Sequence, residues 1–520
     1  MSVQYPVENS FDFVIVGAGA AGCVTAEKLS RHYSCLLLEA GGDDLDPAVH
    51  QNDQWFFCAT KEELTWAFPT TPQAHLDSRQ LNPNMGRVVG GSTSINAMYW
   101  VRGSLLDYDR WETIYHCAGW NTDRFLQAYK TIEKTEHGHD KFHGRSGHTE
   151  VRQVEPSAPF NSFAQACEQA GVPFTPDSNS DKQLGYSLLW YNVTKDWQRH
   201  SAFRAFIHPH LGRANLTVKT GANTRRVLVD SEHRAVGVEF IGSDGERRTV
   251  RARKEVILSA GSLKTPQLLM LSGIGDADHL QSVGIDPLVN LPGVGLHLQD
   301  HLVAVLMFSA KRNLPSTPEW STWQVLGPTN LDWAQNQRAD FQLQWVVREN
   351  FLPGFPKPEG HENSHVIATV VAVLHPNGKG SVKLASADPS AAPVINPNYL
   401  GDDADMVTWR AGFKLLRKLM AAPAMNDWVE GEIGDCPLGN DLENYVRKNC
   451  FSQWHPVGTC RMNSDSDFLS VVDDRCRVRG VRGLRVIDAS VMPELPSGNT
   501  QAPTMAVAEI ASNMVVEDHA

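Results

Sequence analysis

The chain has 520 residues, which at about 150 residues per domain is far more than one small binding module needs. It is 42% hydrophobic and 20% charged, a balance that excludes a disordered, collagen-like or coiled-coil protein. Its 47 Lys and Arg against 59 Asp and Glu give a net charge of -12. Because no basic run could neutralise a row of phosphates, we expect no nucleic-acid partner.

The cysteines and the N-terminus indicate the compartment. Nine cysteines are widely spread without a CxxC pair, so we expect free thiols in a reducing environment. The N-terminus lacks the basic and apolar segments of a secretion signal, and no stretch approaches about 18 uncharged apolar residues. These features predict a soluble, cytoplasmic protein with no transmembrane segment. They leave open whether it is a monomer or a homo-oligomer.

The first forty residues have the pattern of a β-α-β unit. An apolar run at 13–16 breaks into a Gly-rich turn, helix formers occupy 20–30, and a second apolar run at 35–38 ends at Glu39. Parallel strands joined in this way belong to a doubly wound sheet, so the sequence predicts an α/β domain here.

Later segments predict a second kind of architecture. Short apolar runs between residues 216 and 260 indicate a β-meander that feeds another strand. Residues 310–400 are rich in Pro and Trp, with alternation at 341–347 and a long apolar run at 366–374, which favours an antiparallel domain. Helical periodicity is found in two more segments, 406–420 and 502–516.

The Gly-rich turn has the spacing of a dinucleotide-binding motif. Gly17 allows the tight turn, Gly19 allows close approach of backbone to a pyrophosphate, and Gly22 allows the helix to pack on the strand. The helix N-terminus then faces the pyrophosphate, and Glu39, seventeen residues after Gly22, can accept the ribose hydroxyls. The motif alone does not separate NAD from FAD.

Further segments make the prediction more specific. They are GRVVGGSTSIN at 86–96 followed by DYDRW at 107–111, GSLKTPQLLMLSGIG at 261–275, WHPVGTCRM at 454–462, VIDASVMP at 486–493 and GNT at 498–500. In this order they resemble the signatures of the glucose-methanol-choline (GMC) oxidoreductase family over nearly the whole chain.

The resemblance implies an FAD enzyme that oxidises an alcohol. FAD would lie in the doubly wound, Rossmann-like domain, and an α+β substrate domain with a six-stranded antiparallel sheet would cover the flavin ring. The expected FAD-binding domain is discontinuous, comprising 1–155, 200–305 and 462–520. The expected substrate-binding domain comprises 156–199 and 306–461.

Carried over residue by residue, the resemblance also implies the cofactor contacts. The expected FAD-binding residues are Gly17, Gly19, Ala20, Ala21, Gly22, Glu39, Ala40, Trp66, Arg87, Gly90, Gly91, Ser92, Asn96, Ala97, Met98, Val227, Ala260, Gly261, Trp454, Asp488, Ala489, Asn499, Thr500 and Gln501. Val227 matches a position whose backbone meets the adenine. Ile95 stands where some relatives attach FAD through a His, so we expect a non-covalent flavin.

Two residues are expected to be catalytic. A base near the flavin must take the hydroxyl proton, and His455 in the WHPVGT segment matches the family's base. Asn499 cannot act as a base but can hydrogen-bond the substrate oxygen. Residues 500–502 open a helix with Pro503 in its first turn, so its amides can face negative charge on the flavin.

Three other patterns in the sequence concern possible metal sites and the substrate cavity. Residues 361–365 spell HExxH, but Pro and Gly precede them and a β-branched run follows, so the helix that a zinc site needs is not expected; His365 would instead face the substrate cavity. The irregular tract His137, His139, His143 and His148 resembles a solvated loop, and we expect no metal site. Trp320, Trp323, Trp333 and Trp345 are expected to form core and cavity wall, which favours an aromatic or apolar alcohol.

The function expected from the sequence is oxidation of a primary alcohol to the aldehyde, with O₂ or an external acceptor reoxidising the flavin. Choline is less favoured, because no carboxylate and aromatic cage for its ammonium can be located. The alternative is a flavin-containing lyase or photodecarboxylase on the same scaffold. An NAD-sensing binding module fits only the first forty residues.

Overall fold

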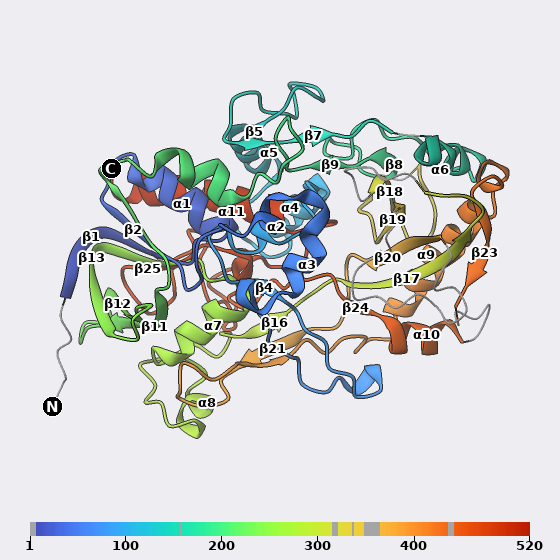
Figure 1. The fold of residues 1–520 in the computed structure, drawn as a ribbon. Helices are drawn as coiled ribbons and strands as arrows, with labels where there is room; N and C mark the ends of the chain where they lie inside the picture. The colour runs from blue at the N-terminus through green and yellow to red at the C-terminus, as the bar shows by residue number, and fades with distance from the viewer. Residues whose placement is uncertain (1–6, 157, 315–320, 335–336, 348–364, 435–440) are drawn as a thin grey trace.

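The computed structural model describes all of the chain except residues 1–6, 157, 315–320, 335–336, 348–364 and 435–440. Two sheets lie toward opposite ends of the molecule, with helices packed on each of them (Figure 1). The described helices are α1 (Ala20–Ser30), α2 (Pro47–His50), α3 (Trp55–Thr60), α4 (Leu105–Thr113), α5 (Thr122–Ile132), α6 (Ala158–Gln169), α7 (Gly261–Leu271), α8 (Ala277–Ser282), α9 (Asp405–Met420), α10 (Leu442–Asn449) and α11 (Gln501–Asp518).

The first sheet has a parallel centre. Its strands are β1 (Val7–Val16), β2 (Cys35–Leu38), β10 (Leu216–Lys219), β11 (Asn223–Val229), β12 (Ala235–Ile241), β13 (Arg247–Leu258) and β25 (Leu484–Val486). β10, β2, β1 and β13 are parallel neighbours, and β12 and β11 continue the order antiparallel. One edge of β13 pairs first with β12 and then with β25.

This sheet differs in two details from the meander expected at 216–260. The run at 216–219 pairs in parallel with β2 and so belongs to the centre of the sheet. The runs at 248–252 and 255–258 are one continuous strand, β13, because no turn residue separates them. The β-α-β unit is confirmed, and α1 packs between the sheet and the long buried helix α11.

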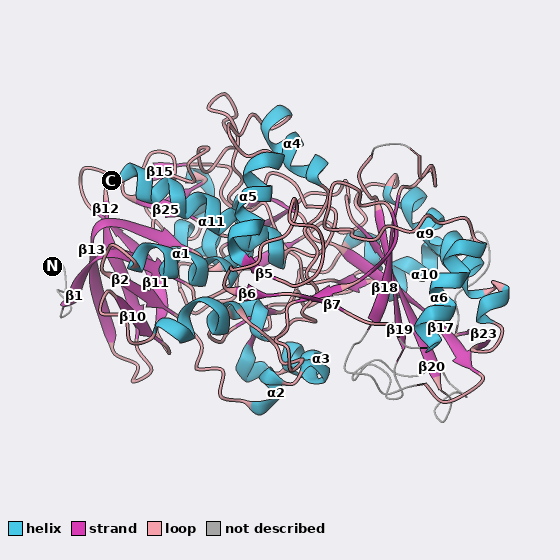
Figure 2. Ribbon diagram, turned by 90° about the horizontal axis from the view of Figure 1, so that it is seen from above, coloured by secondary structure: helices cyan, strands magenta, loops and turns pink. Residues whose placement is uncertain are grey.

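The second sheet is antiparallel. Its order is β23 (Val429–Ile433), β17 (Leu302–Ala310), β20 (Val366–Val373), β19 (Phe341–Val347), β18 (Ser321–Gly327) and β8 (Gly185–Leu188). Six strands stand in a row, and the two-residue β24 (Phe451–Ser452) adds a seventh beside β17 in the described chain. Helices α6, α9 and α10 cover one face of this sheet (Figure 2).

The other described strands form small sheets of two or three strands outside these two large sheets. They are β3 (Thr65–Trp66), β4 (Met85–Gly86), β5 (Glu133–Lys134), β6 (Thr149–Glu150), β7 (Arg152–Gln153), β9 (Trp190–Tyr191), β14 (Ile274–Gly275), β15 (Val289–Asn290), β16 (Leu296–Leu298), β21 (Gly380–Lys383) and β22 (Val394–Asn396). The domain boundaries expected from the sequence remain a prediction.

Strand alternation decides where the tryptophans lie. Phe341, Leu343 and Trp345 share the face of β19 that packs against α6 and α9, whereas Gln344 and Val346 occupy the opposite face. Trp323 and Trp333 belong to the same helix-side core, and Trp320 lies outside the described residues. The expectation that these indoles wall the cavity is therefore wrong for the three that are described, because they stand on the other side of the sheet.

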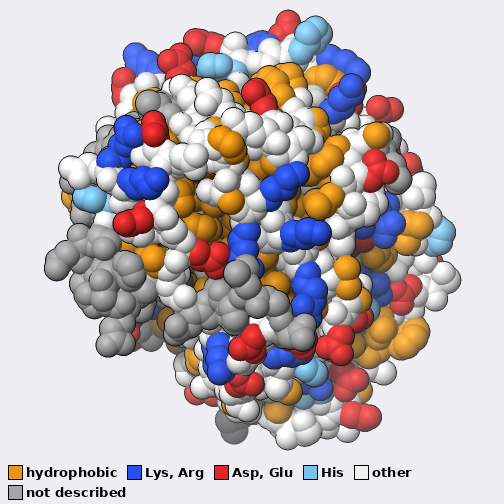
Figure 3. All heavy atoms as spheres, turned by 90° about the vertical axis from the view of Figure 1, so that its right-hand side faces the viewer, with side chains coloured by type: hydrophobic (Ala, Val, Ile, Leu, Met, Phe, Trp, Pro, Cys, Tyr) orange, Lys and Arg blue, Asp and Glu red, His pale blue; other side chains and the backbone are white. Residues whose placement is uncertain are grey.

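The surface carries charges of both signs, and the described cysteines are buried. Acidic and basic side chains intermingle on the face shown in Figure 3. The eight described cysteines are buried free thiols, and Cys436 lies outside the described residues. Within the described ranges, no helix combines the length and apolar character needed to cross a membrane.

Candidate active site

One large cavity extends from the turn after β1 to the inner face of the second sheet. Its walls combine Gly-rich loops of the first part with Val303, Gln344, Val346 and Val370 of the second sheet. The cavity thus joins a backbone-rich end to an end built from side chains.

The Gly-rich end is shaped by the β1–α1 turn. Gly17 has a φ of 102°, and a Cβ there would lie 2.4 Å from the Ser259 carbonyl oxygen, so no other residue fits without displacement. Glu39 lies at the end of β2 and accepts hydrogen bonds from the amides of Ala18 (2.9 Å) and Gly41 (2.8 Å). Burial raises the pKa of Glu39 to about 7, against the lowering effect of those amides.

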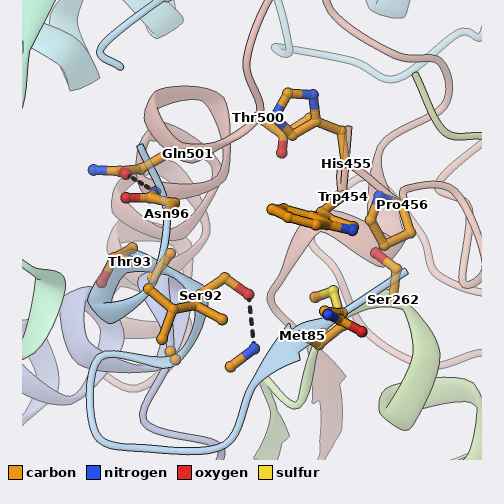
Figure 4. Close-up of a pocket in the computed structure, with 18 of the residues that line it drawn as sticks. Met85, Ser92, Thr93, Asn96, Ser262, Trp454, His455, Pro456, Thr500 and Gln501 are labelled. Atoms are coloured by element: carbon orange, nitrogen blue, oxygen red, sulfur yellow. Dashed lines mark hydrogen bonds between the residues drawn. The ribbon is translucent and has the colours of Figure 1, made fainter. Parts of the chain in front are cut away.

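A second loop, residues 90–96, runs against this turn. A Cβ on Gly91 would come within 2.8 Å of the Gly19 Cα, so the two backbones can approach this closely because residue 91 is glycine. The buried Arg199 guanidinium holds the loop by donating to the carbonyl oxygens of Thr93 (3.2 Å) and Asn96 (2.6 Å). The Asn96 side-chain amide donates to Gln501 at the start of α11 (Figure 4).

The cavity fits the dinucleotide expected from the sequence. Helices α1, α7 and α11 all begin at its wall. The Asp488 carboxylate accepts the first amide of α7, that of Gly261, whereas α1 and α11 have neither a side-chain cap nor an acidic residue in the first turn. Their first amides and positive dipole ends are therefore left to face an anionic or carbonyl-bearing ligand. A pyrophosphate at α1 and a flavin ring beside α11 would match these two helix ends.

His455 and Asn499 meet at the cavity wall, although 44 residues separate them. The Asn499 Nδ2 lies 3.4 Å from the His455 Nε2, and the Asn499 Oδ1 is buried without a partner. Burial lowers the pKa of His455 well below its ordinary value, with a smaller contribution from His301. His455 is therefore a neutral imidazole that can accept a proton.

The environment behind His455 is polar and closed. His455 Nδ1 lies 3.0 Å from the Nδ1 of His301, and the His455 backbone N–H donates to Asp300 at 2.7 Å. Asp300 also accepts from the hydroxyls of Tyr399 and Ser452, both at 2.5 Å. Burial raises the pKa of Asp300 to about 6, although these donors oppose the shift.

The wall beyond His455 is mostly apolar. Besides the four second-sheet residues, it comprises Trp55, Phe56, Phe451 and Trp454. Trp55, Phe56 and Trp454 form one aromatic cluster, with ring centroids 5.4 to 6.3 Å apart. Among the described lining residues only Glu39 and Asp488 are acidic, and both belong to the Gly-rich end.

Most residues expected at the cofactor lie on this cavity. Those that line it are Gly17, Gly19, Ala20, Ala21, Glu39, Ala40, Trp66, Gly91, Ser92, Asn96, Ala97, Met98, Ala260, Gly261, Trp454, Asp488, Ala489, Asn499, Thr500 and Gln501. Asp488 is held rigidly, because it accepts from the Gly261 amide, the Thr265 hydroxyl and Ser490.

Four expected residues do not line the cavity. Gly22 packs against Gly17, where a Cβ would come 1.9 Å from the Gly17 carbonyl oxygen, and Gly90 donates its N–H to Ala18. The Arg87 guanidinium stacks over the Trp66 ring at 4.7 Å. Val227 is buried, and its N–H donates to the Ser272 hydroxyl; from the same strand, Asn223 and Thr224 reach the cavity instead.

The sequence reasoning missed several site residues. Arg199, His301 and Asp300 were not identified, although the last two lie in the GVGLHLQDH segment at 293–301. Lys264 was also missed; it lies over Trp66 at 4.8 Å, and burial lowers its pKa to about 8. Alternation along the second sheet would have placed Gln344 and Val346 on the face opposite Trp345.

The histidine patterns occupy other places. His143 is buried between Glu133 and Asp177, so it is structural and not part of a solvated loop. His148, His210 and Glu27 form the one grouping with metal-ligand spacing in the described chain, but Arg31 and Arg213 already neutralise the Glu27 carboxylate. Residues 361–364 lie outside the described residues, and His365 precedes β20 outside the described cavity lining.

Comparison with known proteins agrees with this geometry. The sequence profiles of GMC oxidoreductases match residues 11–303 and 376–508. The chain is 37% identical to an oxygen-dependent choline dehydrogenase of Photobacterium profundum, over 98% of this chain and 94% of the relative. It is 37% identical to an alcohol dehydrogenase [acceptor] of Pseudomonas putida, over 97% and 96%. The crystal structure of pyridoxine 4-oxidase from Mesorbium loti superposes with a TM-score of 0.91 at 28% identity, over 97% and 99% of the two chains. The chain therefore belongs to the GMC oxidoreductase family.

Proposed function

We propose that this protein oxidises a primary alcohol with an aromatic or apolar substituent to the aldehyde. The observation that carries the proposal is the pairing of His455 Nε2 with Asn499 Nδ2 at the junction of the cavity's two ends. A base and a neutral donor at one point are what an alcohol oxygen needs, since it donates one hydrogen bond and accepts another.

His455, Asn499 and the first amides of α11 have different roles in the proposed reaction. The substrate hydroxyl donates to His455 Nε2 and accepts from Asn499 Nδ2, which aligns the carbinol carbon with the cofactor. His455 takes the hydroxyl proton as the hydrogen on carbon leaves with its electron pair. Bound FAD supplies the hydride acceptor, N5, and passes the electrons to O₂ or another acceptor. The first amides of α11 would stabilise the negative charge that collects on the ring when FAD is bound.

The residues that would hold FAD offer only non-covalent contacts at the position where some relatives attach it. Ile95 is buried beside Asn96 and carries no nucleophilic atom. Glu39 would bind the ribose, the α1 N-terminus the pyrophosphate, and the 90–96 loop the ring and its ribityl chain. We therefore expect acid precipitation to release the yellow colour from the polypeptide.

The apolar wall supports the substrate class. Valine and aromatic side chains dominate the second-sheet end, and the uncharged polar residues Gln344, Ser452 and Gln453 interrupt them. A choline-type substrate is the second candidate, because the Trp55, Phe56 and Trp454 cluster could contact a quaternary ammonium. The described wall offers that cation no carboxylate, which favours the uncharged alcohol.

The test is anaerobic bleaching of the flavin absorbance by alcohols of matched size. We expect benzyl-type alcohols to bleach the flavin faster than choline or a sugar alcohol. The same panel with peroxide detection, beside an artificial-dye assay, assigns the acceptor. Failure of every alcohol to bleach the flavin would favour the lyase or photodecarboxylase alternative.

A further inference from the structure

The partner of the catalytic imidazole is itself a histidine. His301 lies immediately before β17, is completely buried, and does not line the cavity. Its Nε2 lies 2.9 Å from the carbonyl oxygen of Leu374, the residue after β20. Its Nδ1 faces the Nδ1 of His455 at 3.0 Å.

These two contacts determine the hydrogen positions on both rings. A carbonyl oxygen only accepts, so His301 must carry its proton on Nε2 and present a lone pair on Nδ1. Two lone pairs would repel at 3.0 Å, so His455 must donate from Nδ1. The Nε2 of His455 then has the free lone pair, which is the state that the adjacent Asn499 Nδ2 donor requires.

We propose that His301 is a positioning residue that locks His455 in the tautomer whose Nε2 lone pair faces the substrate hydroxyl. This inference rests on the proposed function, in which Nε2 is the base. His301 is well suited to the role because β17 and β20 are paired in register, with Leu302 opposite Val373. His301 and its hydrogen-bond partner Leu374 are therefore attached to adjoining ends of these two strands.

The neutral partner has a chemical consequence. Burial lowers the pKa of His301 to about 4, so it accepts from His455 without adding a negative charge. The nearby carboxylate of Asp300 bonds the His455 backbone and two hydroxyls, and none of these contacts reaches an imidazole nitrogen. The tautomer is therefore set without the rise in His455 basicity that a carboxylate partner would cause.

The experiment compares two substitutions in the FAD-loaded enzyme. His301→Leu removes the acceptor, whereas His301→Gln keeps one oxygen for His455 and one N–H for Leu374. We expect His301→Leu to slow alcohol-driven flavin bleaching by about 10- to 100-fold with little change in KM, and His301→Gln to restore most of the rate. His297→Asn is the matched control: it lies four residues earlier, its Nε2 has no partner, and it should keep the wild-type rate.

A second readout does not depend on turnover. In protein labelled with ¹⁵N-histidine, with and without FAD, the His455 signals assigned by difference with His455→Ala should show a protonated Nδ1 and a bare Nε2. In His301→Leu both signals should shift toward the average of the two tautomers. The inference is overturned if wild-type His455 is protonated on Nε2, if His301→Leu reacts within twofold of wild type, or if His301→Gln is no better than His301→Leu. If no alcohol bleaches the flavin, the proposed function fails while the NMR result still decides the tautomer.

Discussion

The two ends of the cavity are built by different means. The Gly-rich end, proposed for the cofactor, consists mostly of backbone: Gly17 and Gly91 let loops approach closely, and the uncapped helices α1 and α11 begin at its wall. The second-sheet end, proposed for the substrate and called the substrate end below, consists of side chains that alternate along β17, β19 and β20. Backbone sites tolerate few residue types, whereas a pleated sheet accepts many on its inner face.

This difference explains why one end can be shared within a family and the other can vary. Relatives named for choline and for other alcohols align over nearly the whole chain. A change at Gly91 would push two backbones apart, whereas a change at Gln344 or Val346 alters only the shape or charge of the wall. Substitutions at the two ends should therefore fail in different ways.

The largest effect is expected at the junction of the two ends. His455→Ala removes the proposed base, so we expect flavin reduction by alcohol to slow by about 10²- to 10⁴-fold while FAD stays bound. Stopped-flow bleaching measures the rate, and the flavin-to-protein absorbance ratio measures binding. His365→Ala, outside the described cavity lining, is the control and should react as wild type. An unchanged rate in His455→Ala would remove this residue from the mechanism.

The next largest effect is expected at the backbone end. Gly91→Ala places a Cβ 2.8 Å from the Gly19 Cα, so the 90–96 loop must shift away from the pyrophosphate turn. We expect FAD affinity to fall by about 10- to 100-fold, the equivalent of about 1.4 to 2.8 kcal/mol. The measurement is fluorescence titration of the apoprotein with FAD.

A matched glycine keeps that prediction testable. Gly42→Ala introduces the same methyl group where no heavy atom lies within 4 Å, so its FAD affinity should stay at the wild-type value. Equal affinities for the two variants would show that the Gly19–Gly91 contact does not shape the cofactor site.

The same contrast determines what could be predicted from the sequence. The β-α-β unit, Glu39 and the pairing of His455 with Asn499 followed from motifs, since those residues act through local turns or fixed spacing. Arg199 and His301 act through partners distant in the chain, such as Asn96 and His455, and nothing local to them indicates those contacts.

The tryptophans show the limit of composition. Four indoles in one region suggested an aromatic cavity wall, but Trp323 and Trp345 belong to the strand face that packs on helices. The aromatic wall comes instead from Trp55, Phe56 and Trp454, which precede or follow that region. Counting a residue type does not assign it to a face of a sheet, whereas its phase in the alternation does.

A smaller and more selective effect is expected at the substrate end. Gln344→Glu keeps the side-chain shape and adds a carboxylate to the apolar wall, where it can attract a quaternary ammonium. We expect the ratio of kcat/KM for choline to that for benzyl alcohol to rise about tenfold, with FAD content unchanged. Gln342→Glu, on the same face of β19 but outside the described cavity lining, should leave the ratio unaltered. A fall in FAD content without a change in the ratio would place Gln344 outside the substrate end.

The smallest effect is expected from pH. Burial holds the pKa of His455 well below its ordinary value of 6.5, and a histidine with a lowered pKa stays neutral to lower pH. The His455 imidazole is therefore neutral, and able to accept a proton, both at pH 8 and at pH 6.5. The rate of flavin reduction at saturating alcohol should change less than about twofold between these two pH values. Stopped-flow traces across this range measure it, with the FAD absorbance confirming that the cofactor stays bound. A loss of rate on acidification with its midpoint at or above pH 6.5 would show that the imidazole is solvated during the reaction. The closed environment beside His301 and Asp300 would then not lower the pKa of His455.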